Sequence, residues 1–229
     1  MRRSRADIRD MSSPKAALLI AALLASASLS SCGSTGGARA ATPAGGASRV
    51  RAVPEAPSPA SITPDLPISR PPFARVEASW KDRMEVPYAY LEHRGTYAET
   101  GALIPALLRE LAAQGLEPDG APFALFYDDP GQTPLTQLRS RACVPLRGRP
   151  RVVAPLRFEL LPSRTVAYAF AAGPYPEVPR AYPGLLQYAA GMNWEPAGPI
   201  RETYLVAPGP GVRMDELLTE IQVPVRGRE

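Results

Sequence analysis

The sequence predicts an α+β domain built from two copies of a strand-strand-helix-strand-strand unit. The first observation is an internal repeat, because residues 95–145 align with residues 173–224 at an offset of 78, with one inserted residue near the end. The second is that each half holds short alternating runs typical of strands around one apolar stripe with helical spacing. Glycines and prolines recur at equivalent turn positions, as in the pairs Gly95 and Gly173, Pro105 and Pro183, and Gly120 and Gly198.

The first half should form four strands and one helix. We expect strands at residues 76–80, 87–92, 123–127 and 138–146. The helix lies somewhere within 98–113, where the leucines at positions 103, 107, 108 and 111 share one face, and Gly115 closes it. The turn-rich segment 128–131 joins the last two strands.

The second half should repeat this order. We expect strands at residues 156–161, 165–171, 201–206 and 216–225, and a helix at 177–192. Pro105 and Pro183 coincide under the repeat, although a proline inside a helix costs about 3 kcal/mol. Either each helix begins at its proline, or a short preceding turn joins it at a kink.

The N-terminus has the pattern of an export signal, so residues 1–31 are left out of the fold. Five basic residues precede a short apolar run at 16–28, which is too short to span a bilayer. The segment Leu29-Ser30-Ser31-Cys32-Gly33 then resembles the bacterial lipoprotein box, which implies a lipid on Cys32; an ordinary secretory signal is the alternative. Gly33 favours the outer membrane facing the periplasm, if the cell has one, and Met11 is a second candidate start.

Composition predicts a Pro/Ala/Gly-rich disordered linker at residues 32–72, followed by one domain at 73–229. The halves of this domain span about 74–148 and 152–226. Five of the 26 Lys and Arg and two of the 22 Asp and Glu lie in residues 1–31, so the remainder carries about +1. This near-neutral balance argues against a nucleic-acid partner.

The residue inventory excludes several enzyme classes. His93 is the single histidine, and the chain has no phosphate-binding glycine motif and no paired-cysteine spacing. A zinc site, a Ser-His-Asp triad and a bound cofactor are therefore not expected. Cys143 lies in a strand-like run, which favours a small core residue over a reactive thiol.

An acid among aromatic residues is the strongest candidate site. In the predicted strand 201–206, alternation places Glu202 and Tyr204 on one face. The equivalent residue of the first half is Ala124, so the acid is not part of the repeated scaffold. A carboxylate flanked by aromatic rings suits an organic cation, although Glu202 on a solvated edge is the plain structural alternative.

Four segments, 90–97, 123–130, 167–175 and 202–204 with 218–224, together resemble the GyrI-like small-molecule-binding family, over about residues 74–226. This family also supplies the effector-binding domains of multidrug-responsive regulators. The resemblance implies two antiparallel sheets related by a pseudo-twofold, with a ligand cleft between the modules on the face away from the helices. It also implies that Glu202 is the acid of the pocket and Tyr204 its aromatic neighbour. Further wall residues, expected from position, are Tyr127, Tyr168, Tyr175 and Trp194.

Three functions remain open at this point. The first is a lipid-anchored extracytoplasmic protein that binds a small amphipathic molecule, including organic cations, at Glu202, without the DNA-binding domain of the regulators. The second is a hydrolase of strained electrophilic molecules, in which Glu202 orients a water as general base. The third is an interaction module of the envelope.

Overall fold

The computed structural model describes residues 64–228, and the export signal, Cys32 and most of the predicted linker lie outside them. Within this range no helix has the length and apolar character needed to cross a bilayer. The strands are β1 (Ile68–Ser69), β2 (Ala78–Arg83), β3 (Val86–Arg94), β4 (Phe123–Phe126), β5 (Arg139–Pro145), β6 (Arg157–Leu161), β7 (Arg164–Ala172), β8 (Trp194–Pro196), β9 (Ile200–Val206) and β10 (Leu218–Gly227). The α-helices are α1 (Ile104–Ala113) and α2 (Tyr182–Gly191), and 3₁₀ helices η2 (Tyr97–Leu103), η3 (Leu135–Gln137), η4 (Tyr175–Ala181) and η5 (Met214–Glu216) complete the elements.

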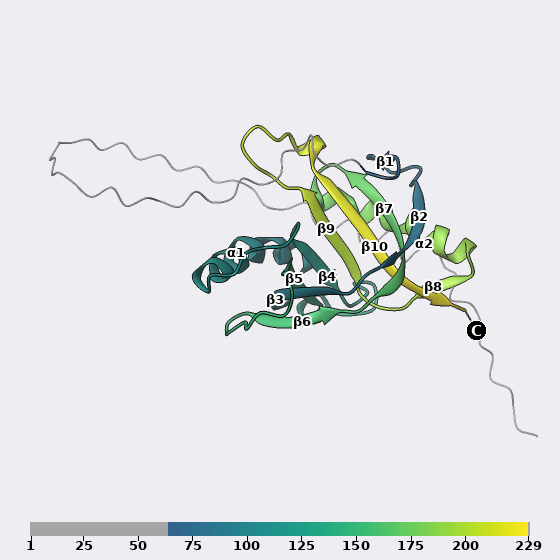
Figure 1. Ribbon diagram of the computed structural model, residues 1–229. Coiled ribbons are helices and arrows are strands. Elements are labelled where there is room, and N and C mark those ends of the chain that lie inside the picture. Colours follow the sequence, from purple (N-terminus) through teal and green to yellow (C-terminus); the bar gives the residue numbers. More distant parts are fainter. Residues whose placement is uncertain (1–63, 229) are drawn as a thin grey trace, which may run out of the picture.

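The strands form one sheet, where the sequence predicted two. Their order is β1-β7-β10-β9-β4-β5-β3-β6, while β2 also pairs with β7 and β8 with β10. The two halves join because β4 and β9 are antiparallel neighbours, with Phe123 opposite Thr203 and Phe126 opposite Ile200. Backbone groups at the inner edge of each half thereby find partners that two separate sheets would leave unpaired. The mixed α+β class is confirmed (Figure 1).

Both helices resolve the predicted problem of their prolines in the same way. A 3₁₀ helix runs directly into each α-helix, and Pro105 and Pro183 occupy the second helical position. A proline there costs little, because the first-turn amides have no partner within the helix. Gly115 ends the first helix as predicted, with a φ of +68° and its amide bonded to the Ala112 carbonyl at 3.1 Å.

The eight predicted strands are all present, with ends that move by up to three residues. Two short strands were missed. β8 is only three residues long, and β1 lies within the predicted linker, where Ile68 and Ser69 pair in parallel with β7. Phe73 follows as a buried core residue. The predicted linker boundary at residue 72 is therefore too late, because this segment gains strand pairing that its composition does not reveal.

Element bounds recur at the offset seen in the sequence. β3 and β7 each span nine residues whose numbers differ by 78, and the same offset relates η2 to η4 and α1 to α2. Ala124 and Glu202, which this offset makes equivalent, are direct cross-strand partners where β4 meets β9. The central junction of the sheet therefore brings the two equivalent positions side by side.

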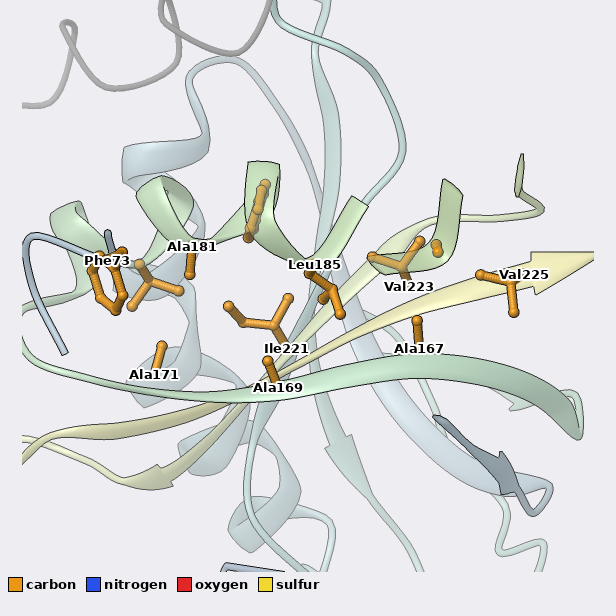
Figure 2. Packing of buried hydrophobic residues seen from close by; sticks show 12 residues of the cluster. Phe73, Ala167, Ala169, Ala171, Ala181, Leu185, Ile221, Val223 and Val225 are labelled. Atoms are coloured by element: carbon orange, nitrogen blue, oxygen red, sulfur yellow. The ribbon is translucent and has the colours of Figure 1, made fainter. Parts of the chain in front are cut away.

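Both α-helices cover the same face of the sheet. Leu107 and Leu111 of α1 pack on Ala142 and Val144 of β5. Leu185 of α2 belongs to the second cluster, which Figure 2 shows between the helix and strands β7 and β10 and which includes Phe73, Ala169, Ile221 and Val223. Small residues on the strands let each helix approach the sheet closely, and the large side chains of the helices fill the space.

Gly184 sets how closely α2 approaches Val76, which lies just before β2. A Cβ placed on Gly184 would lie 2.7 Å from both Cβ and Cγ2 of Val76. We expect Gly184→Ala to destabilise the fold by up to about 2 kcal/mol, because overpacking costs about 1–3 kcal/mol and the gain in helix propensity offsets about 1 kcal/mol of this cost. Urea unfolding would measure the change.

Val76 offers the matched test of this packing. Val76→Ala keeps the Cβ that lies 2.7 Å away, whereas Val76→Gly removes it. Relief of the Gly184→Ala defect by Val76→Gly but not by Val76→Ala is the expected outcome, with each double variant compared with its own Val76 single variant. Equal relief by both, or a stabilised Gly184→Ala protein, would contradict the close contact.

Candidate ligand-binding site

Glu202 lies in the middle of the face that carries the helices. Directly opposed residues of antiparallel strands point to the same side of a sheet. Such pairs form a row across five neighbouring strands. In the order β5, β4, β9, β10 and β7, the row consists of Ala142, Ala124, Glu202, Ile221 and Ala169. α1 covers one end of this row and α2 the other, and Glu202 is its one polar member.

The Glu202 carboxyl group is buried and bonded to two phenols. Glu202 is 5% exposed. Tyr182, in the first turn of α2, donates from its hydroxyl to Oε1 at 2.5 Å, and Tyr204 donates to Oε2 at 3.4 Å. Within residues 64–228, Glu202 takes part in no salt bridge. This carboxyl group therefore has hydrogen-bond donors but no counter-ion.

Three tyrosines of the second half, Tyr175, Tyr182 and Tyr204, lie at this group, Tyr97 of the first half lies near Tyr182, and Phe126 lies against Tyr97. We call these five residues the aromatic cluster. The rings of Tyr175 and Tyr204 lie 4.8 Å apart between centroids. Those of Tyr97 and Phe126 lie 4.7 Å apart. Tyr97 begins η2 and Tyr175 begins η4, so the two 3₁₀ helices each supply one tyrosine at equivalent positions.

Burial controls the electrostatics of the site. Desolvation raises the pKa of Glu202 to about 7, although the hydrogen bonds from Tyr182 and Tyr204 act in the opposite direction. Burial and the nearby Glu202 carboxyl group raise the pKa of Tyr175 to about 12 and that of Tyr182 well above its usual value. The phenols therefore stay protonated at neutral pH, and the carboxyl group is poised between its two states.

This arrangement corrects two sequence-based expectations. Glu202 is not on a solvated edge, since β9 is an inner strand with β4 and β10 on either side. The cleft was expected on the face away from the helices, but Glu202 faces α2 and bonds to Tyr182. The helix side is the one that holds the acid because the register pairs Glu202 with Ile221 of the α2 core.

The structure unites three of the six predicted pocket residues and separates the others. Glu202, Tyr204 and Tyr175 lie together. Tyr127 lies instead beside Arg141, whose guanidinium carbon is 5.3 Å from the ring centroid. It lines a separate pocket of about 160 Å³ with Glu92, His93, Arg94, Arg139, Ser140 and Arg141.

The remaining two predicted residues also lie away from Glu202. Tyr168 points to the opposite face of the sheet, where its hydroxyl donates to Asp65 at 2.8 Å and Lys81 Nζ lies 4.0 Å from its ring centroid. Trp194 packs beside the α2 core and makes an edge contact with Trp80 at 6.2 Å. Strand alternation separates Tyr168 from Glu202, because Tyr168 follows Ala167, which faces α2.

Sequence reasoning missed three members of the aromatic cluster. Tyr97 was available through the repeat, because it aligns with Tyr175. Phe126 was available in the same way, because it aligns with Tyr204. Tyr182 gave no such signal, since it aligns with Ile104 and an aromatic residue in the first turn of a helix is ordinary in a core. Tyr182 reaches Glu202 only because α2 packs on β7 and β10, and β10 is the neighbour of β9 in the sheet.

Two other expectations concern reactive groups. Cys143 is a fully buried free thiol, and burial raises its pKa well above the usual value, as suits the predicted core role. Between residues 64 and 228, no three His, Cys, Asp or Glu side chains gather in a way that could hold a metal ion.

The fold and this site define a class of protein: a small-molecule-binding α+β domain with a buried acid at its centre. The family model for the GyrI-like small molecule binding domain matches residues 78–226. The chain therefore belongs to the GyrI-like family, whose domains bind small molecules. No curated protein matches the sequence significantly.

Solved structures show the same fold. The C-terminal domain of EcmrR has a TM-score of 0.59 and 21% identity, and the match covers 67% of this chain and 99% of that one. EcmrR in its complex with DNA, in EcmrR-RPo, has a TM-score of 0.58 and 22% identity, and the match covers 66% of this chain but 57% of EcmrR. An uncharacterized conserved protein from Listeria innocua has a TM-score of 0.50 and 10% identity, and the match covers 65% of this chain and 92% of that one.

Proposed function

We propose that this protein captures a small amphipathic organic cation at Glu202 while a lipid on Cys32 holds it at the cell envelope. The observation that carries the ligand proposal is a buried carboxyl group that has no counter-ion and lies among aromatic rings. An ionised carboxylate in such a place is costly unless a cation joins it. A ligand with a positive charge and an apolar body supplies the missing partner.

Binding requires the aromatic cluster to open. Tyr182 is 9% exposed and Tyr204 7% exposed, so both phenols cover the carboxyl group in the ligand-free state. A ligand that reaches Glu202 replaces the hydroxyl of Tyr182 at Oε1 and stacks between the rings supplied by η2 and η4. Each cation–π contact adds about 0.5–2 kcal/mol. Ala124, the cross-strand partner of Glu202, is small, whereas a large side chain there would crowd the carboxyl group.

The repeat suggests why the site lies at this point. We take the two halves as modules related by a pseudo-twofold axis, which then passes between Ala124 and Glu202, since these equivalent residues pair with each other. A cleft on this axis receives one wall from each module, with Tyr97 and Tyr175 as equivalent wall residues. The single acid makes the cleft asymmetric, so one ligand has one preferred orientation.

Calorimetric titration with a panel of aromatic quaternary ammonium compounds, each beside its uncharged carbon analogue, tests the ligand proposal. Wild type should prefer the charged member of at least one pair. Glu202→Gln, which keeps the shape of the side chain, should weaken that binding at least about tenfold, because a desolvated charge pair is lost. Glu117→Gln removes an exposed carboxylate and should leave binding unchanged. Equal affinities of wild type and Glu202→Gln would overturn the proposal.

The affinity for the cation should also depend on pH. The pKa of Glu202 is about 7 in the ligand-free fold, and only the ionised carboxylate pairs with a cation. Affinity should therefore fall by about tenfold for each pH unit below 7 and level off above it. Titrations at pH 5, 6, 7 and 8 would measure this slope, and a flat profile for wild type would contradict the assignment of Glu202.

The location at the membrane is a separate part of the proposal. It rests on the lipoprotein box around Cys32, which lies outside the described residues. Cys32→Ala should move the protein from the membrane to the soluble fraction, as measured by detergent partitioning. Retention of Cys32→Ala in the membrane would exclude the lipid anchor without affecting the ligand proposal.

Hydrolysis is the second candidate, favoured by one observation. A carboxyl group with a pKa of about 7 is suited to act as a general base at neutral pH. Product formation from strained electrophilic rings, followed by mass spectrometry and absent in Glu202→Gln, would select this function. Binding without product formation would select capture alone.

A further inference from the structure

A second group of buried polar residues lies on the opposite face of the sheet, away from the helices. Arg201 precedes Glu202 in β9 and therefore points to the other side. Trp80 in β2 pairs with Ala167 and so shares the face that carries α2. Arg83, three residues further along β2, points to the opposite face, as Arg201 does. Arg83 is 7% exposed and Arg201 8% exposed.

The charges of this group do not balance. Glu220 is the buried acid on this face, but its Oε1 already lies 2.6 Å from Lys81 Nζ and accepts from Gln222 at 3.0 Å. Arg83 and Arg201 take part in no salt bridge with the other described residues. Lys81, Arg83 and Arg201 therefore share one buried carboxylate, and of the three only Lys81 forms an ion pair with it.

Most of the hydrogen-bonding capacity of the two guanidinium groups is also unused. Arg83 makes one bond, from Nη2 to the Pro162 carbonyl at 2.9 Å, whereas its Nε and Nη1 have no partner. Arg201 Nε has no partner either, and its guanidinium carbon lies 4.1 Å from the Phe123 ring centroid. The hydroxyl of Thr203, two residues along β9 on the same face, is a further buried group without a partner.

Burial disfavours the charged form of both arginines. It lowers the pKa of Arg201, and it lowers the pKa of Arg83 to about 10, where the charges of Arg201 and Arg164 act in the same direction and Glu220 acts in the opposite one. Two guanidinium groups that repel each other inside a protein are costly, and removal of their N–H groups from water adds to this cost. An oxyanion between them would relieve both costs, because a guanidinium fork matches the oxygens of carboxylate, phosphate or sulfate.

We propose that Arg83 and Arg201 form a second binding site, which takes a small oxyanion on the face of the sheet opposite Glu202, with the Thr203 hydroxyl as an additional donor. This site is independent of the cation site. The strand β9 separates them, since Arg201 and Thr203 point one way and Glu202 the other. One sheet thus presents an acid on one side and a pair of bases on the other.

Titration of the full-length chain with sodium phosphate, sulfate and acetate, at constant ionic strength set with sodium chloride, tests this site. Calorimetry and the thermal unfolding midpoint should both report saturable binding of one anion per chain. Saturation matters because sulfate and phosphate also stabilise proteins without binding a site. A response to phosphate and sulfate identifies a tetrahedral oxyanion, and a response to acetate alone identifies an organic carboxylate.

Arg83→Met and Arg201→Met are the informative variants. Replacement of a buried charge by an apolar side chain of similar length is often neutral or stabilising, so both proteins should fold. Each should bind the anion at least tenfold more weakly than wild type. Arg149→Met, whose side chain is 68% exposed, is the matched control and should bind as wild type does. Glu202→Gln should also retain the anion while losing the cation.

Two results would overturn the proposal. One is a response to the anions that does not saturate in wild type. The other is a saturable response that Arg83→Met and Arg201→Met share equally with wild type. Neither result bears on the capture of cations, since that function depends on Glu202.

Discussion

Glu202→Gln should raise the free energy of unfolding of the ligand-free protein by about 3 kcal/mol at pH 8. Burial raises the pKa of this carboxyl group from the usual 4.5 to about 7 in the folded state. A carboxyl group with a raised pKa contributes stability that is fully present below pH 4.5 and is lost as the pH rises to about 7. The shift corresponds to about 3 kcal/mol at 1.36 kcal/mol per pH unit.

Urea unfolding at several pH values would measure this difference. The wild-type and Glu202→Gln curves should converge near pH 4, separate between pH 4.5 and 7, and stay parallel above pH 7. Glu117→Gln controls for the loss of an exposed carboxylate and should follow wild type throughout. A difference that does not vary with pH would mean that Glu202 is ionised, or neutral, over the whole range.

The same variant connects stability to binding. If the ionised carboxylate is costly in the empty site, a bound cation removes that cost, and the variant should be more stable but unable to bind. Such an opposition between stability and function is common where a binding site holds an uncompensated polar group. A Glu202→Gln protein that is both less stable at pH 8 and unable to bind would indicate a structural role instead.

Leu185→Ala should produce the second large effect, a loss of about 2–5 kcal/mol in the free energy of unfolding. Leu185 is fully buried at the centre of the cluster that attaches α2 to β7 and β10 (Figure 2). Its truncation removes apolar burial and leaves a cavity that the surrounding alanines cannot fill. Because α2 also carries Tyr182, the Glu202 site should become more accessible in this variant.

The adjacent residue provides the control. Leu186 is 36% exposed, so Leu186→Ala should change the free energy of unfolding by about 0.5 kcal/mol or less. Chemical denaturation of both variants, with thermal unfolding as a second measurement, would compare them. Equal effects would mean that α2 is not held by the packing of its inner face.

Local pattern predicted the eight longer strands and both α-helices. The alternation of strands 87–92 and 165–171 and the leucine stripe of the first helix predicted the corresponding elements, because one buried face imposes a period of 2 or 3.6 on the sequence. Of the alternatives left open for Pro105 and Pro183, the structure has each proline in the first turn of its α-helix, after a 3₁₀ helix. Alternation also placed Glu202 and Tyr204 on one face, where both now lie in the same cluster.

The sequence by itself therefore determined the longer elements, the offset of 78 at which their bounds recur, and the placement of Glu202 and Tyr204 on one face of a strand. Only the tertiary structure decided that β4 pairs with β9, that the strands form one sheet, and that Glu202 faces α2 rather than the opposite face. Tyr182 joined the site, while Tyr127, Tyr168 and Trp194 did not. The physical reason is that pairing between distant strands and the docking of a helix depend on contacts between residues far apart in the chain, which no local period records.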